Sequence, residues 1–143
     1  MKNKNLVNFI LILLMVGTGV STAIYRNVYL DRNHKIIRGK ITSLEVGVKG
    51  NPAVFVNYSF QLNQKSIQGK TAILNTNSLQ DYKYLHSLIE NKSLPILFQK
   101  DNFENNKMLF TKEDFEKYKV SPTHEEEEIV NRIDSLIDSE SKR

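Results

Sequence analysis

An uncharged segment near the amino terminus constrains this chain more than any other feature of its sequence. Residues 5–25 contain no ionisable side chain before Tyr25, and residues 9–16 are an unbroken apolar run. As a helix rising about 1.5 Å per residue, such a segment is about 30 Å long, which is the thickness of the hydrocarbon core of a bilayer. The rest of the chain is therefore predicted to be tethered to a membrane or exported across one.

The sequence alone leaves two interpretations of this segment open. A signal peptide has a basic start, a short apolar centre and a cleavage site of small residues, and Lys2, Lys4 and the small residues within 17–23 fit that plan. A retained anchor needs about 20 apolar residues, which the chain supplies if those same small residues lie in lipid. Tyr25 and Arg26 would then lie at the interface, where aromatic and basic side chains are favoured.

Positive charge is concentrated directly after this segment. The net charge is +6 over residues 1–40, +2 over 41–121 and −4 over 122–143. A nucleic-acid-binding protein concentrates its basic residues on the folded domain, so nucleic acid is not expected to be a partner. Anionic headgroups would instead attract the basic residues that follow the segment, by about 1 kcal/mol each. These residues are Arg26, Arg32, Lys35, Arg38 and Lys40.

The basic residues on the two sides of the segment favour opposite orientations in the membrane. Lys2 and Lys4 favour an inside amino terminus, whereas the five basic residues after the segment favour the reverse. Because the start of the chain resembles an export signal, we expect a single-pass membrane protein with an extracytoplasmic domain. The chain has no cysteine, which excludes disulfides, thiolate metal sites and a lipid-modified cysteine.

Beyond residue 35 the sequence predicts a small antiparallel sheet. The clearest strand is 53–62, in which apolar side chains recur with a period of two, as is typical of a half-buried strand. Gly69 suggests a bulge or a sharp coil, and the polar stretch 101–106 is expected to be a loop. Further strands are predicted at 36–46, 66–74, 94–98 and 107–110, and helices at 79–89 and from 112 to about 119, each after a capping residue.

These patterns resemble a bacterial family of unknown function. The resemblance is carried by the apolar amino-terminal helix, by the stretch from Val56 to Gly69 that follows Gly39-Lys-Ile41, and by Ile96-Leu-Phe98-Gln-Lys100. Members of that family have a small β-barrel domain attached to one or more transmembrane helices. The resemblance covers about residues 6–110 and implies a retained anchor rather than a cleaved signal, but no activity.

The last apolar pattern lies in residues 121–143, which are predicted to form an acidic amphipathic helix. Thr123 and Glu126 have the spacing of a capping box, and the run 125–128 places negative charge at the positive end of the helix. An apolar stripe follows at helical spacing, and it needs cover from the chain's own sheet or from another protein. We expect the stripe to dock a protein partner or a second copy of the chain. Its members are Ile129, Ile133, Leu136 and Ile137.

No catalytic, cofactor or metal motif is present in the sequence. The three histidines are too dispersed for a metal site, and the carboxylates form no recognisable acid/base pair. Aromatic residues on the predicted strands could stack nucleic acid bases, but their alternating positions favour the core. These candidates are His34, His86 and His124; Asp81, Glu90 and Asp101; and Tyr58, Phe60 and Phe98.

The predicted architecture is therefore α+β: an N-terminal transmembrane helix, a small antiparallel β-barrel or curled sheet of about five strands, and a C-terminal amphipathic helix. Residues 1–30 form the anchor or signal peptide, 36–120 the barrel-like domain and 121–143 the acidic helix. The predicted function is a membrane-anchored, non-enzymatic accessory or protein-interaction module, held in the lipid bilayer through Leu6 to Tyr25. The alternative is an exported soluble domain that binds a small ligand or protein after signal cleavage.

Overall fold

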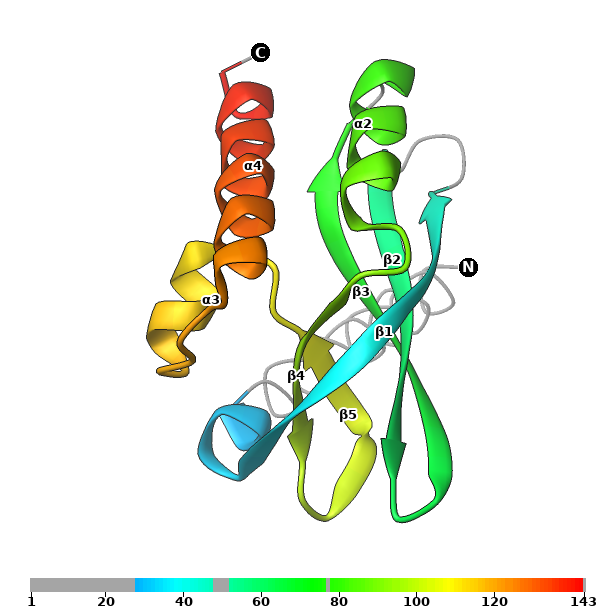
Figure 1. Cartoon of the computed structure of the whole chain (residues 1–143), viewed down its shortest axis with the longest axis vertical. Coiled ribbons are helices and arrows are strands. Elements are labelled where there is room, and N and C mark those ends of the chain that lie inside the picture. Colours follow the sequence, from blue (N-terminus) through cyan, green and yellow to red (C-terminus); the bar gives the residue numbers. More distant parts are fainter. Residues whose placement is uncertain (1–27, 48–51, 77, 143) are drawn as a thin grey trace, which may run out of the picture.

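Five antiparallel strands and the helices that cover them make up the described part of the chain (Figure 1). The computed structural model describes residues 28–47, 52–76 and 78–142. The strand order is β3-β2-β1-β4-β5, so the predicted α+β class with a small curled sheet is confirmed. The predicted transmembrane helix lies outside the described residues. The elements are β1 (His34–Val46), β2 (Ala53–Leu62), β3 (Lys65–Asn75), α2 (Leu79–Ile89), β4 (Ser93–Gln99), β5 (Asn102–Met108), α3 (Lys112–Lys117) and α4 (His124–Glu140).

The strand β2 has the predicted bounds and the predicted alternation. Val54, Val56, Tyr58 and Phe60 are buried, whereas the residues between them are half-buried. β2 pairs with β1 on one side and with β3 on the other. Because it lies inside the sheet with one face toward the core, its sequence shows the period of two most clearly.

The turn between β2 and β3 is a two-residue hairpin. Asn63 and Gln64 have φ angles of 50° and 65°, the left-handed pair that matches the twist of adjacent strands. Leu62 and Lys65 are the facing residues that close it. The strands predicted at 53–62 and 66–74 are therefore adjacent in the sheet and joined by a tight turn.

The sheet curls until β3 and β5, its two outer strands, come together across a seam. No backbone pairing joins these two strands among the described residues; side chains join them instead. The hydroxyl of Tyr58 lies 3.0 Å from Thr71 Oγ1 on β3 and donates to Asn106 Oδ1 on β5 at 2.9 Å. The fold is therefore a nearly closed sheet rather than a continuous barrel.

Gly69 lies at this seam; of the bulge or sharp coil predicted at this residue, the bulge is wrong, because Gly69 pairs in register with Tyr58. The extra residue of β3 is Ile73, between the pairs Val54–Leu74 and Phe55–Ala72. A Cβ atom at Gly69 would lie 2.2 Å from the Tyr58 ring and 2.1 Å from Asn106 Oδ1. The absence of a side chain here makes room for the tyrosine that links the two outer strands.

Two apolar clusters lie on opposite faces of the sheet. The main core fills its concave side and includes residues of all five strands, α2 and α4. A smaller core lies behind β4 and consists of Leu30, Leu97, Leu109, Phe115 and Val130. β4 is buried on both faces because Leu94, Ile96 and Phe98 enter the main core while Leu97 enters the smaller one.

The helices begin where the sequence predicts. The side chains of Ser78, Thr111 and Thr123 accept hydrogen bonds from the backbone N–H three residues later, which satisfies donors that the helix itself leaves unpaired. The capping box of Thr123 and Glu126 is complete. Figure 1 shows α2 and α4 at the same end of the sheet, away from the two hairpin turns.

Two boundaries differ from the predicted ones. The loop expected at 101–106 is wrong: β5 occupies Asn102–Met108 and pairs with β4. Its asparagine-rich sequence is typical of a loop, but Asn105 is buried and donates to Gln99 Oε1 at 2.9 Å. β1 begins at His34 rather than at residue 36, directly after a helical segment over residues 28–32.

Candidate functional site

The stripe on α4 is the surface that the sequence singled out, and the structure places its two halves differently. Ile129 and Ile133 are 3% and 1% exposed and belong to the main core. Leu136 and Ile137 are only half-buried, at the margin of the same core. Docking of a partner on the stripe remains a prediction, and the half that has surface to offer is Leu136 and Ile137.

Val130 is the residue of α4 that the stripe omits. It is buried in the smaller core, on the other side of β4 from Ile129. α4 therefore contacts both cores, and a single apolar face does not describe it. A second apolar position one residue after Ile129 was the available signal, but it falls outside the narrow stripe.

A groove runs between the end of β3 and the carboxyl-terminal half of α4. Its volume is about 460 Å³. Ala72 and Asn75 are exposed along the strand, and the half-buried Ile137 faces them from the helix. The full lining is Ala72, Ile73, Leu74, Asn75, Ile137, Glu140 and Ser141. The accessible half of the stripe thus continues into a hollow beside a strand edge.

One end of this groove carries negative charge. Thr76, which follows β3, is buried, and its hydroxyl lies 3.1 Å from Glu140 Oε1 on α4 and 3.3 Å from Asp81 Oδ2 on α2. The same hydroxyl accepts a hydrogen bond from Ser78 N at 3.0 Å. Two carboxylates from different helices therefore converge at the point where the strand ends.

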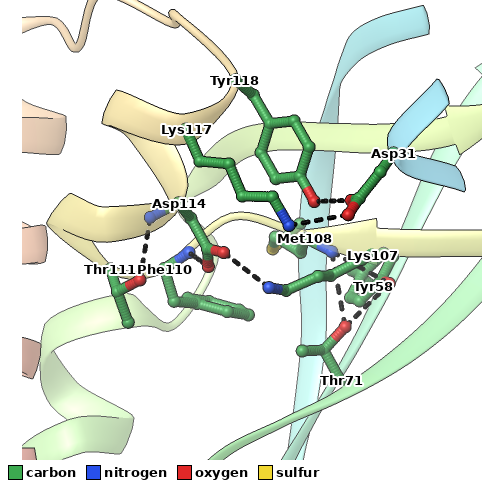
Figure 2. Close-up of polar contacts among 10 residues, drawn as sticks. All are labelled: Asp31, Tyr58, Thr71, Lys107, Met108, Phe110, Thr111, Asp114, Lys117 and Tyr118. Atoms are coloured by element: carbon green, nitrogen blue, oxygen red, sulfur yellow. Dashed lines mark hydrogen bonds and ion pairs between the residues drawn. The ribbon is translucent and has the colours of Figure 1, made fainter. Parts of the chain in front are cut away.

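A second polar region ties the start of the described chain to α3 (Figure 2). Lys117 Nζ donates to Asp31 Oδ2 at 2.8 Å, and the Tyr118 hydroxyl donates to Asp31 Oδ1 at 2.5 Å. The ring of His34 meets the edge of the Tyr118 ring at a centroid distance of 5.4 Å. Together with the burial of Leu30, these contacts fix residues 28–32 against the domain.

The ionisable groups of this region shift one another. Burial opposes ionisation of Asp31, but the hydrogen bonds from Lys117 and Tyr118 outweigh it, so the pKa of the Asp31 carboxyl lies below its ordinary value. The hydrogen bond to Asp31 raises the pKa of Lys117 to about 12. Burial, and then the adjacent carboxylate, raise the pKa of Tyr118. Asp31, Lys117 and Tyr118 therefore form a hydrogen-bonded cluster with a charged ion pair at neutral pH, which we call the clasp.

Next to this clasp, β5 and α3 are joined by a further ion pair. Lys107 Nζ donates to Asp114 Oδ1 at 2.5 Å, and Phe110 N donates to the other oxygen of the same carboxylate at 3.5 Å (Figure 2). A hollow of about 270 Å³ lies between this pair and β3. Its cations, Lys107 and Lys117, are each already paired with a carboxylate.

The glutamate run at the start of α4 is paired in part with other elements. Glu126 is buried, accepts from Thr123 N at 2.7 Å and is paired with Arg38 of β1 through both carboxylate oxygens. Glu125 pairs with Lys92, and Glu128 with Arg132. Burial would raise the pKa of Glu126, but the hydrogen bonds from Arg38 and Thr123 hold that pKa below its ordinary value. The run therefore fastens α4 to its surroundings.

The histidines and aromatic residues that the sequence offered as candidates make contacts within the domain. His34 contacts the backbone carbonyls of Leu30 and Asp31 at 3.1 Å each, and His86 lies 3.5 Å from Glu90. Tyr58, Phe60 and Phe98 are core residues, as expected. Among the described residues, no group of three or more histidine, cysteine or acidic side chains is placed to hold a metal ion.

Comparison of the chain with protein-family models, with curated proteins and with solved structures found no match. The family resemblance seen in the sequence therefore remains a prediction. Within residues 28–142, as far as the structure describes them, no helix has the length and apolarity needed to cross a bilayer. The segment for which an anchor is predicted precedes these residues.

Proposed function

We propose that this chain is a membrane-anchored, non-enzymatic interaction module. The observation that carries the proposal is the short separation in sequence between the apolar segment and the packed part of the domain. Only residues 26–29 separate Tyr25, the end of the segment, from Leu30, which is 4% exposed in the smaller core. A segment retained in lipid would hold the domain close to the membrane surface.

The clasp supports the same proposal. Asp31 is held by both Lys117 of α3 and Tyr118, the residue that follows α3, so a displacement of residue 30 would be transmitted to the domain through these contacts. Such a connection suits a module that must present one face to a neighbour in a fixed orientation. The face that we assign to this role is the groove beside α4, where the sequence-derived stripe retains accessible surface in Ile137.

Membrane retention of the full chain tests the proposal. After extraction with alkaline carbonate, the protein is expected to stay in the membrane pellet. Leu13→Arg places a charge in the apolar run at a cost to insertion of about 2.5–3.5 kcal/mol, so this variant should shift to the supernatant. Leu79→Arg, at a position 66% exposed on α2, is the matched control and should stay in the pellet.

The alternative function, a soluble exported domain, is favoured by one feature, the cluster of small residues at 17–23. Amino-terminal sequencing of the protein recovered from cells separates the two. A full-length amino terminus in the pellet supports the anchor. A soluble product that begins at Ile24 contradicts the anchor and supports signal cleavage.

A further inference from the structure

The edge of β3 beyond Thr71 faces no strand in the described residues, where β3 pairs with β2 alone. The residues that close the hairpin, Leu62 and Lys65, set the alternation of hydrogen-bonded pairs along β3. At its far end, Thr76 N donates to Pro52 O toward β2 at 2.9 Å. Counting from these two points, the backbone groups of Ala72 and Asn75 are directed away from β2. Outward N–H and C=O groups of an edge strand are a template for a further strand.

The groove gives this edge an opposite wall. The residues 72–75 lie along one side and Ile137 and Glu140 of α4 along the other, in a volume of about 460 Å³. That volume is within the range of sites that bind peptides and other small ligands, roughly 300–1,000 Å³. The strand edge would bind the backbone of a ligand, and Ile137 would contact one of its side chains.

The size of the edge favours a single extended chain over a second folded copy. Four residues of strand are about 13 Å long. An interface limited to so short an edge would bury much less than the roughly 1,200 Å² that a stable protein pair buries. α4 also occupies the space into which a second sheet would extend, because it lines the other wall of the groove.

The charge of the groove specifies the ligand further. Asp81 and Glu140 converge on Thr76 at the end of β3, and residues 122–143 have a net charge of −4. A lysine or arginine side chain on the ligand would complement this end. In an antiparallel strand, the residue nearest to Thr76 is the amino-terminal residue of the ligand.

We propose that the groove between β3 and α4 binds an extended peptide segment of a partner protein, with a basic residue at its amino-terminal end, as an added strand on β3. The inference rests on the proposed function, since it names the chemistry of the partner that the module would hold. Its recognition would be through backbone hydrogen bonds along residues 72–75, with the basic residue setting direction and register.

The test uses the full chain in detergent micelles and an acetylated pentapeptide of sequence Lys-Val-Thr-Val-Thr at millimolar concentration. Binding should slow the amide hydrogen exchange of Ala72 and Asn75, measured by NMR. A peptide with methylated backbone nitrogens has the same side chains, but it lacks the donors and its methyl groups keep its carbonyls from approaching the strand edge, so it should give no protection. Protection with both peptides, or with neither, would overturn the proposal.

The charge is tested with two variants of α4. Glu140→Lys should weaken peptide binding about tenfold or more, because an attraction becomes a repulsion. Glu127→Lys makes the same charge change at the other end of the helix and should leave affinity within about twofold. Equal affinity of both variants would overturn the assigned direction and register. Protection of Ala72 and Asn75 that rises with protein concentration and needs no peptide would show a second copy instead. None of these outcomes changes carbonate extraction, which tests the anchor separately.

Discussion

The hydroxyl of Tyr58 contacts both outer strands of the sheet, and it lies beside a direct bond between them in which Met108 N donates to Thr71 Oγ1 at 3.4 Å. It accepts from Met108 N of β5 at 3.1 Å, in addition to its contacts with Thr71 and Asn106. Tyr58→Phe keeps the ring and removes these bonds, so that the buried N–H of Met108 loses its best partner. We expect a loss of about 1–3 kcal/mol in the free energy of unfolding, measured by urea titration of the full chain in micelles.

Tyr84→Phe is the matched control. Tyr84 is exposed on α2, and its hydroxyl accepts a hydrogen bond from Arg132 at the surface, at 2.8 Å. A change of about 0.5 kcal/mol or less is expected there. Comparable losses for the two variants would mean that the seam is held by ring packing alone.

The sequence predicted which residues of β2 are buried, but it did not predict the hydrogen-bond partners of Tyr58. The period of two in β2 placed Tyr58 and Phe60 in the core, and both are buried. That Tyr58 reaches β5 depends on the closure of the sheet, which brings together residues 50 positions apart. The role of Gly69 follows from the same closure, since its space is filled by Tyr58.

At the scale of elements, Glu126 joins α4 to β1 and caps the helix. Because its folded pKa lies below the ordinary value of 4.5, its ionised form stabilises the fold. That contribution is fully present above the unfolded pKa and is lost as the pH falls through the folded pKa. Glu126→Gln should therefore lower stability near pH 7 by about 1–2 kcal/mol, the range for loss of a helix cap. The deficit should shrink below about pH 4.5, as measured by melting temperatures across this range.

Glu127→Gln serves as the reference, because Glu127 is exposed one position further along α4. This substitution should change stability near pH 7 by about 0.5 kcal/mol or less. A constant deficit for Glu126→Gln from neutral to acid pH would contradict the electrostatic role of the carboxylate.

The elements themselves were largely predictable where local chemistry decides them. Thr123 with Glu126 predicted a capping box, and the box is present. The partner of Glu126, Arg38, lies 88 residues away and has no local signal. The strand predicted at 107–110 overlaps only the end of β5, and the start of β5 was missed for a similar reason: pairing with β4 overrides an asparagine-rich sequence that favours a loop on its own.

At the scale of the whole molecule, the helical segment over residues 28–32 packs against the sheet and its helices. From the sequence, residues 28–35 are predicted to be a helix end followed by a linker, because they are polar and charged; the helix end is present at residues 28–32. In the structure Leu30 completes the smaller core and Asp31 joins the clasp. A short segment with two aliphatic residues among polar and charged ones carries too little pattern to predict docking, which depends on where α3 and β4 lie.

The orientation of the domain relative to its anchor should therefore depend on Leu30. Leu30→Asp would place a charge in the smaller core, release residues 28–32 and leave the main core in place. Because the chain has no cysteine, spin labels can be introduced cleanly at the exposed positions Arg32 and Lys119. We expect a narrow distance distribution between them in the parent protein in liposomes and a broad one in the Leu30→Asp variant.

Val28→Asp makes a like change in the same helical segment, at a position that is 44% exposed, and it should keep the distribution narrow. A narrow distribution in both variants would mean that the connection is fixed without Leu30. Broad distributions in both would mean that charge in this segment, rather than burial of Leu30, releases it. Only the combination of a broad distribution for Leu30→Asp and a narrow one for Val28→Asp assigns the fixed orientation to the packing of Leu30 against Leu97, Leu109 and Phe115.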